Sequence, residues 1–244
     1  MAKDIQLLTL DLDNTLWDVD KIIIRAEKEM RQWLADAAPQ SLDHYNQENL
    51  PSFRQQVVDR FPDKVHDLSF MRIEVLTLVM EAAGYEAQRS RDLADAAFDV
   101  FFQGRNRVEF FPGAVESLTE LSARYTIIAL TNGNADIERA GLSDWLSGAI
   151  SSADVGKSKP SAEMFHAPLS QFGINAGQAI HIGDNPIDDV QGARNVGMHT
   201  VWVNLEGSSE PGDNAISPAD ETVLHKEVSH LNQLSTAIAE IAAG

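Results

Sequence analysis

The sequence predicts an α/β fold class, a Rossmann-like doubly wound parallel sheet core with an inserted α-helical cap domain. Three observations lead to this prediction. A short apolar run at Ile5–Leu10 contains strand-forming residues and stops at an aspartate. Residues 20–107 carry apolar side chains at helical spacing, without a clear strand signal. Beyond residue 107, strand-like and helical segments alternate, which indicates parallel strands with helices on both faces.

The domain boundaries follow from this change of pattern. We expect a Rossmann-like core formed by residues 1–19 and 108–244, and a helical cap formed by residues 20–107. Proline and glycine residues separate the helices of the cap. The expected cap helices are Lys21–Ala38, Leu50–Phe61, Leu68–Ala83 and Asp92–Gln103.

The core elements after the cap are short and regularly spaced. A glycine at position 197 is a typical C-terminal stop for the helix before it. A stretch rich in Gly, Ser and Pro, Gly207–Pro218, predicts a loop. The expected strands are Tyr125–Leu130, Ala179–Ile182 and His199–Val203, and the expected helices are Ala114–Arg124, Ala135–Leu142, Ser161–Phe172, Ile187–Val196 and Leu231–Ala243.

Composition narrows the function classes. The 244 residues include 37 Asp and Glu against 19 Lys and Arg, so the net charge is 19 − 37 = −18. An acidic chain is a poor match for nucleic acid, whose phosphates need a basic face. The absence of cysteine excludes disulfides, thiolate catalysis and Cys-ligated metals. We find no run long enough to span a membrane and no signal peptide, so we expect a cytoplasmic protein. The sequence does not indicate the oligomeric state.

Four polar clusters follow predicted strands or lie in the loops between them. They are Asp11-Leu-Asp-Asn-Thr15, Thr131-Asn-Gly133, Lys157-Ser-Lys-Pro160 and Gly183-Asp-Asn-Pro-Ile-Asp-Asp189. Parallel strands place their carboxyl ends on one edge of the sheet, so these clusters are expected to converge. Carboxylates, a hydroxyl, turn amides and a lysine together suit phosphoryl transfer with a hard divalent metal.

The carboxylates divide into three expected roles. Asp11, at the end of the first strand, can attack phosphorus and form an acyl phosphate. Asp13 can protonate the leaving oxygen and later activate water. Asp11 and Asp184 can hold magnesium, which prefers oxygen ligands and is usually bound by one or two carboxylates.

The remaining polar residues are expected to hold the phosphate. The Thr131 hydroxyl and the backbone amides around Asn132 and Gly133 can bind phosphate oxygens. Lys159 can neutralise the charge that spreads over the transferring group.

Each cluster also has a simpler interpretation. An Asp-x-Asp pair is often a turn or cap, and such pairs occur in metal-dependent glycosyltransferases. Thr-Asn-Gly alone is a plain turn, Lys159 alone a loop lysine, and Asp188 a first-turn helix residue. The seven histidines show no metal-ligand spacing, and His181, inside a strand, is expected to be structural. The order and strand-end placement of all four clusters favour the catalytic interpretation.

These motifs resemble those of the haloacid dehalogenase (HAD) superfamily of phosphatases. The four family motifs are matched in order by DLDNTLWD, LTNGNA, GKSKPSAEMF and HIGDNPIDDVQGA, between Ile5 and Val203. The resemblance implies Asp11 as nucleophile, Asp13 as acid and base with its backbone carbonyl on Mg²⁺, and Asp184 as a metal ligand. It also implies Thr131 and Lys159 as phosphate ligands, Lys159 being favoured over Lys157 because the family lysine commonly precedes proline. Asp189 matches the second acidic position of the last motif better than Asp188, and the helical insert resembles the family's four-helix cap.

Within the superfamily the chain is most similar to bacterial FMN phosphatases of the riboflavin pathway, which also act on 5-amino-6-(5-phosphoribitylamino)uracil. The resemblance rests on DLDNTLWD, TNGNA followed by GLSDW, and the cap stretch MRIEVLTLVMEAAG. It implies a small phosphorylated metabolite as substrate, with Trp17, Arg72, Arg105 and Arg107 as candidate specificity residues. The alternative is that Trp17 packs in the core and the three arginines form ion pairs at the surface. Dehalogenases of this fold lack the second aspartate of the first motif, so Asp13 argues against dehalogenation.

Three other functions stay open at this point. The chain could be a different sugar-phosphate or nucleotide phosphatase, or a phosphomutase that returns the phosphoryl group to its product. It could also be a binding protein on a phosphatase fold, which the intact set of Asp11, Asp13, Lys159 and Asp184 argues against.

Overall fold

The structure is a computed structural model that describes residues 3–205 and 222–244. The chain divides into two compact units, one formed by residues 1–18 and 109–244 and the other by residues 19–108. The first unit contains the sheet and the second is helical. The loop predicted at Gly207–Pro218 lies outside the described residues.

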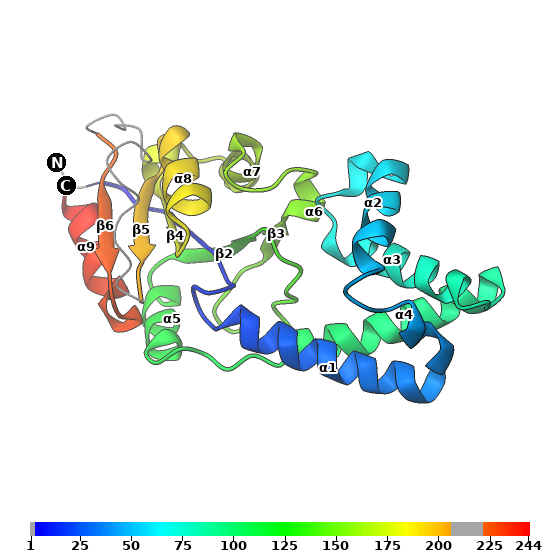
Figure 1. The fold of residues 1–244 in the computed structure, drawn as a ribbon. Helices are drawn as coiled ribbons and strands as arrows, with labels where there is room; N and C mark the ends of the chain where they lie inside the picture. Colours follow the sequence, from blue (N-terminus) through cyan, green and yellow to red (C-terminus); the bar gives the residue numbers. More distant parts are fainter. Residues whose placement is uncertain (1–2, 206–221) are drawn as a thin grey trace. The chain divides into compact units, whose positions relative to one another are not determined.

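A six-stranded parallel sheet forms the centre of the first unit (Figure 1). Its order is β3-β2-β1-β4-β5-β6, so the chain crosses over the sheet between its two halves. In the register, Leu10 of β1 lies opposite Ala129 of β2 and Ile182 of β4, so the carboxyl ends of these three strands lie within two residues of one another along the sheet. The predicted α/β class with a Rossmann-like core is confirmed. The strands are β1 (Leu7–Leu10), β2 (Thr126–Thr131), β3 (Ala149–Ser151), β4 (Ala179–Gly183), β5 (His199–Val203) and β6 (His225–Val228).

Helices cover both faces of this sheet. The helices α5 (Ala114–Ser122) and α9 (Leu234–Ala243) lie on one face, and α7 (Ala162–Phe172) and α8 (Gly192–Asn195) lie on the other (Figure 1). Strand residues such as Leu7 and Ile128 pack with Met164 and Phe165 of α7 in one buried cluster. Both faces being covered explains why the central strands read as continuous apolar runs. The shorter pieces are α6 (Ser152–Val155), the 3-10 turns η3 (Ala176–Gln178) and η5 (Leu231–Gln233), and the π-helical segment η4 (Pro186–Gln191).

The structure corrects three expectations about the core. The segment predicted as the helix Ala135–Leu142 forms turns, because the Asp136 carboxylate accepts from the amides of Glu138 and Arg139 and Gly141 has a φ of +75°. Strands β3 and β6 were not predicted. β3 has only three residues, and β6 reads His-Lys-Glu-Val with two charged residues, so neither carries an apolar run.

The second unit is a bundle of α1 (Val19–Ala37), α2 (Leu50–Arg60), α3 (Leu68–Ala82) and α4 (Ala87–Arg105), with the 3-10 turns η1 (Pro39–Asp43) and η2 (Pro62–Lys64). Its core contains Met30, Leu76 and Phe101. A Cβ at Gly104 would lie 2.9 Å from Cα of Ala26, so glycine permits the close approach of α4 to α1. Among the described helices, none is long and apolar enough to cross a membrane.

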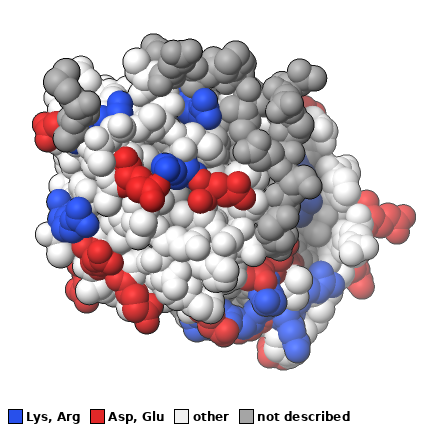
Figure 2. Space-filling model, turned by 90° about the vertical axis from the view of Figure 1, so that its left-hand side faces the viewer, with Lys and Arg blue, Asp and Glu red and all other residues white. Residues whose placement is uncertain are grey.

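The charged side chains are mixed on the face of the molecule drawn in Figure 2. Lys and Arg stand among Asp and Glu and among uncharged surface. The positive charge that a phosphate site needs must therefore be supplied locally.

Candidate active site

A small cavity lies at the carboxyl ends of β1, β2 and β4. Its volume is about 160 Å³. The ends of these three strands supply most of its lining, and the loop before α7 supplies the lysine. The lining residues are Asp11, Asp13, Asn14, Thr131, Asn132, Gly133, Lys159, Asp184, Asn185, Asp188 and Asp189. The structure thus brings all four sequence clusters together at one edge of the sheet.

Asp11 occupies the centre of this cavity. It follows β1 directly, its backbone amide donates to the carbonyl of Ile182 at 2.8 Å, and its side chain is buried. Oδ1 accepts from Nζ of Lys159 at 2.6 Å, and Oδ2 accepts from the Thr15 hydroxyl at 3.1 Å. Burial raises the pKa of Asp11 to about 8, although the nearby Lys159 ammonium acts in the opposite direction. The carboxylate form that a nucleophile needs therefore depends on nearby positive charge.

Lys159 is the only cation among the described residues that line the cavity. Its side chain is buried and donates to Asp11 and to Oδ1 of Asp189, each at 2.6 Å. Burial disfavours the ammonium, but the two carboxylates outweigh burial and raise the pKa of Lys159. The Asn132 side chain holds the lysine's backbone, donating to its carbonyl at 3.0 Å and accepting from its amide at 2.6 Å. Lys157, the other candidate in this motif, is exposed.

Asp184 follows β4 and faces Asp11 across the Thr15 hydroxyl. That hydroxyl lies 3.0 Å from Oδ1 of Asp184 and 3.1 Å from Oδ2 of Asp11, so its single hydrogen serves one carboxylate at a time. Burial raises the pKa of Asp184 to about 6, and the negative charge of Asp189 acts in the same direction. The indole of Trp202 on β5 donates to the backbone carbonyl of Asp184 at 2.8 Å and fixes this turn.

Asp189 is the buried acidic residue of the last motif, while Asp188 is only partly buried. Its Oδ2 accepts from the Asn185 amide at 2.9 Å, and its Oδ1 accepts from Lys159. Burial would raise the pKa of Asp189, but Lys159 holds it below its usual range. A Cβ at Gly183 would lie 2.3 Å from Cγ of Asp189, so only glycine leaves room for this carboxylate.

Asp13 lies at the cavity and is held from behind by an aromatic residue. The indole nitrogen of Trp17 donates to its Oδ1 at 2.8 Å. Trp17 is completely buried and packs on Phe110, with ring centroids 5.9 Å apart. This placement favours the packing interpretation of Trp17 over stacking on a substrate, and it adds an unexpected role in orienting Asp13.

Thr131 ends β2 and is buried, and its hydroxyl accepts from the amide of Gly133 at 2.9 Å. The Gly133 amide is occupied by this bond, so the Thr131 hydroxyl hydrogen is the donor that a phosphate oxygen can use directly, and the Gly133 amide becomes available only if it leaves Thr131.

The three candidate specificity arginines all belong to the helical unit, and two of them, Arg72 and Arg107, form ion pairs there. Arg72 pairs with Glu27 at 3.0 Å and lies over the ring of Phe101, with its guanidinium 3.6 Å from the ring centroid. Arg107 pairs with Glu29. Arg105 is buried. These contacts favour the alternative in which the arginines pack and form ion pairs within the unit.

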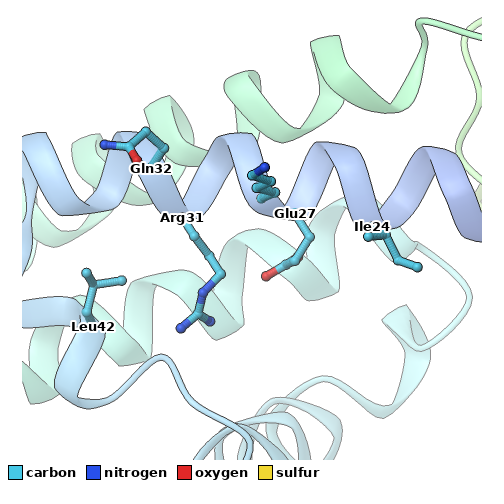
Figure 3. A pocket seen from close by; sticks show the side chains of 6 residues that line it. Ile24, Glu27, Arg31, Gln32 and Leu42 are labelled. Atoms are coloured by element: carbon cyan, nitrogen blue, oxygen red, sulfur yellow. The ribbon is translucent and has the colours of Figure 1, made fainter.

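The helical unit has a groove of its own, with a volume of about 490 Å³. In Figure 3, Glu27 and Arg31 project from α1 on the side where Leu42 lies. Arg31 is anchored there by donating to the Tyr45 carbonyl at 3.0 Å. Ile24 on the same helix is 70% exposed, which is unusual for a large apolar side chain. The groove is lined by Ile24, Glu27, Lys28, Arg31, Gln32 and Leu42.

Sequence reasoning missed the residues that connect the charged groups. Thr15 bridges Asp11 and Asp184, and His181 contacts Asp189 through Nε2 at 2.9 Å. A signal existed for His181, because a polar side chain in the middle of an apolar strand needs a buried partner. No signal in the sequence identified that partner.

Comparison with known proteins places this site in a family. The family model described as haloacid dehalogenase-like hydrolase matches residues 5–197. The chain therefore belongs to the haloacid dehalogenase-like hydrolases, as the motifs indicated. Matches to phosphatases of this family identify it further as a phosphatase.

Two curated relatives and one solved structure illustrate the match. The chain is 30% identical to 5-amino-6-(5-phospho-D-ribitylamino)uracil phosphatase YigB of Escherichia coli strain K12. The alignment spans 236 residues and covers 96% of each chain. It is 37% identical over 153 residues to phosphoserine phosphatase of Thermus thermophilus, covering 60% of this chain and 59% of that protein. It also resembles the crystal structure of 2-haloacid dehalogenase from Pseudomonas syringae pv. Tomato DC3000, with a TM-score of 0.89, 36% identity, and 97% and 99% of the two chains covered.

Proposed function

We propose that this phosphatase is a magnesium-dependent phosphomonoesterase that acts through an aspartyl-phosphate on Asp11. One observation carries the proposal. The buried side chain of Asp11 lines a small cavity, with an ammonium at 2.6 Å and a second carboxylate, Asp184, close by. A carboxylate nucleophile beside compensating positive charge is the arrangement that attack on a phosphate requires.

The donor set fits a hard divalent cation. Carboxylate oxygens of Asp11, Asp184 and Asp189 lie within 4.8 Å of one another. With all three ionised, they carry −3 against +1 on Lys159, so this group of four side chains is left with −2, and Asp13 and Asp188 also line the cavity. Asp189 accepts hydrogen bonds from Lys159, His181 and the Asn185 amide, whereas Asp11 and Asp184 share the single hydroxyl hydrogen of Thr15. Asp11 and Asp184, with the Asp13 backbone carbonyl, are therefore the proposed ligands. Bound magnesium would supply the charge that lets carboxylate and phosphate approach.

The protein's own residues account for the two chemical steps. An oxygen of Asp11 forms a bond to phosphorus while the ester P–O bond breaks, and Asp13 gives its proton to the leaving oxygen. Asp13, now ionised, then takes a proton from water as that water attacks the aspartyl-phosphate. The acyl P–O bond breaks, which releases phosphate and restores Asp11. Thr131, Gly133 and Lys159 hold the phosphoryl oxygens during both steps.

Dehalogenation is the competing reaction, because a solved structure titled as a haloacid dehalogenase is 36% identical to this chain. A halide leaves without a proton, so that reaction has no need of a general acid beside the nucleophile. Here Asp13 is present and its carboxylate is oriented by the Trp17 indole. This favours phosphate ester hydrolysis.

We propose that surfaces outside the phosphate cavity recognise the organic part of the substrate. The cavity of about 160 Å³ is smaller than the roughly 300–1,000 Å³ of typical small-molecule sites. It has room for a phosphoryl group but not for a flavin or a ribityl-uracil. The groove beside α1 combines exposed apolar surface at Ile24 with the Arg31 guanidinium, which suits a planar polar ring. The substrates proposed first are FMN and 5-amino-6-(5-phosphoribitylamino)uracil, the phosphorylated compound that appears in the name of the Escherichia coli relative.

A substrate panel tests this function. The purified protein with magnesium should release phosphate from FMN and the phosphorylated ribityl-uracil compound, and should release no chloride from 2-chloropropionate. Asp11→Asn should abolish turnover without changing the circular dichroism spectrum. Chloride release, or normal turnover by Asp11→Asn, would refute the proposal.

The site of discrimination needs a separate comparison. If the groove of the helical unit selects the substrate, Arg31→Ala should lower kcat/KM for FMN far more than for p-nitrophenyl phosphate, whose small organic part offers little to select. Arg89→Ala, an exposed arginine on α4 that does not line the groove, is the matched control. Equal losses on the two substrates would place discrimination elsewhere.

A further inference from the structure

Three histidines lie on strands of the described sheet, and their surroundings differ. His181 on β4, His199 on β5 and His225 on β6 are each held at one ring nitrogen by a hydrogen bond. The second nitrogen, Nε2, is buried without a hydrogen-bond partner in both His199 and His225. In His181 it lies 2.9 Å from Oδ1 of Asp189. His181 is therefore the strand histidine that connects with the active site.

The hydrogen bonds of His181 define a single tautomer. Burial lowers the pKa of His181, so the ring is neutral and carries one N–H. Asp189 is ionised and can only accept, so that hydrogen belongs on Nε2. Nδ1 then accepts from the Thr9 hydroxyl, 2.8 Å away on β1. The ring of Phe165 meets the imidazole edge-on at a centroid distance of 5.2 Å and restricts its rotation.

Asp189 in turn controls where the Lys159 ammonium lies. Its Oδ1 accepts from both His181 and Lys159, while its Oδ2 accepts from the amide of Asn185. Lys159 divides its donors between Asp189 and Asp11. The hydrogen bond from His181 offsets part of the negative charge of the Asp189 carboxylate. That carboxylate therefore attracts the Lys159 ammonium less strongly away from Asp11.

We infer that His181 is a positioning residue, which fixes Asp189 through its Nε2–H and thereby holds Lys159 against Asp11. The inference rests on the roles proposed above for Asp11 and Lys159. Without the imidazole donor, Asp189 can rotate about its side chain and draw Lys159 toward itself. The ammonium would then be misplaced for the phosphoryl group, although His181 touches neither the substrate nor the reacting atoms.

Two amide substitutions separate this role from simple packing. In His181→Gln the amide nitrogen lies near the position of Nε2 and can still donate to Asp189. In His181→Asn the shorter amide lies near the position of Nδ1 and faces Thr9 instead. We expect kcat for p-nitrophenyl phosphate to fall about 10–100-fold in His181→Asn, the usual loss for an outer-shell hydrogen bond, and much less in His181→Gln. KM should change less than kcat in both variants.

A matched control uses the neighbouring strand. His199→Asn removes a buried imidazole from β5, where no hydrogen bond reaches the site residues from Nε2. It should lower stability but leave kcat unchanged. Equal kcat in His181→Asn, His181→Gln and wild type would overturn the inference, and so would an equal loss in the His181 and His199 variants.

A spectroscopic measurement tests the arrangement independently of activity. In ¹⁵N–¹H correlation spectra, His181 of the wild type should show a protonated Nε2 and an unprotonated Nδ1. Asp189→Asn should shift the His181 resonances and leave those of His199 in place. A protonated Nδ1, or no response to Asp189→Asn, would refute the inference. A wild-type protein that hydrolyses no phosphate ester would instead refute the proposed function, while this measurement would still report on the hydrogen bonds.

Discussion

Replacing Lys159 by methionine tests the electrostatics of the site most directly. Methionine keeps an unbranched chain of similar length but removes the charge. The ammonium lies 2.6 Å from a carboxylate oxygen of Asp11 and 2.6 Å from one of Asp189, and all three side chains are buried. The substitution therefore leaves two buried carboxylates without their shared cation.

The expected loss of stability can be bounded. Removing one partner of a buried ion pair costs about 3–5 kcal/mol. The cost does not double for two carboxylates, because Asp189 still accepts from His181 and Asn185 and because Asp11 can take up a proton. For a chain of this length, each kcal/mol lowers Tm by about 2–4 °C, so we expect a decrease of about 6–20 °C. Loss of a preorganised charge at the phosphoryl group should lower kcat about 10²–10³-fold.

Lys157→Met is the matched control, since it removes the same charge two residues away from an exposed position. Its free energy of unfolding should stay within about 0.5 kcal/mol of wild type. Urea unfolding followed by circular dichroism, with and without magnesium, measures both variants. Magnesium should stabilise Lys159→Met more than wild type, because it becomes the main counter-charge of the carboxylates. Equal unfolding midpoints and equal kcat for the two variants would refute the assignment of Lys159.

Further predictions concern other parts of the site. Asp13→Asn should slow the hydrolysis of alkyl phosphates more than that of p-nitrophenyl phosphate, because only the alkyl leaving group needs a proton. Trp17→Phe removes one hydrogen bond to the Asp13 carboxylate and should show the same pattern more weakly. Equal effects on the two substrates would contradict this role of Asp13. In the metal-free protein the pKa of Asp11 is raised to about 8 and that of Asp184 to about 6. The folded state therefore binds more protons than the unfolded state between about pH 4 and 8, so the free energy of unfolding should fall as the pH rises through that window. Magnesium needs both carboxylates ionised, so calorimetry should show affinity rising from pH 6 to 8 with release of protons, and a pH-independent affinity would argue against these ligands. Gly183→Ala should reduce both stability and kcat, because an added Cβ would lie 2.3 Å from a buried carboxylate, and unchanged thermal melting would contradict the close packing.

The sequence predicted the core where local pattern and global fold agree. Ile5–Leu10 is rich in apolar residues and His199–Val203 in β-branched residues, and they contain the strands β1 and β5. The pattern failed for β6, whose residues His225–Val228 are mostly polar and pair with β5 along a sheet edge. An edge strand has a neighbouring strand on one side only and is less buried than a central strand, so it does not need a continuous run of apolar residues.

The convergence of the four motifs was predictable for a similar reason. Parallel strands that end within two residues of one another along the sheet bring their following residues together whatever the side-chain details. The choice of Lys159 over Lys157 was not predictable from physics alone, because either could extend from a loop. In the structure the Asn132 side chain clamps the backbone of Lys159 and directs it inward. Such side-chain-to-backbone contacts leave no periodic trace in a sequence.

The hydrogen-bonded connections within the site also explain how an acidic protein can bind a phosphate. The chain carries a net charge of −18, and the cavity is lined by five aspartates and one lysine. Three of these aspartates, Asp11, Asp184 and Asp189, lie close enough together to share a metal, and with Lys159 they leave a charge of −2 when ionised. A long-range positive field is therefore excluded as the source of affinity. Attraction must come from charges within a few ångströms, where burial strengthens them. Lys159 supplies one such charge, and the −2 that remains matches one divalent cation. On this reasoning, metal and phosphate should bind cooperatively. The carboxylates repel phosphate and are neutralised by the metal, while Lys159 repels the metal and is neutralised by phosphate.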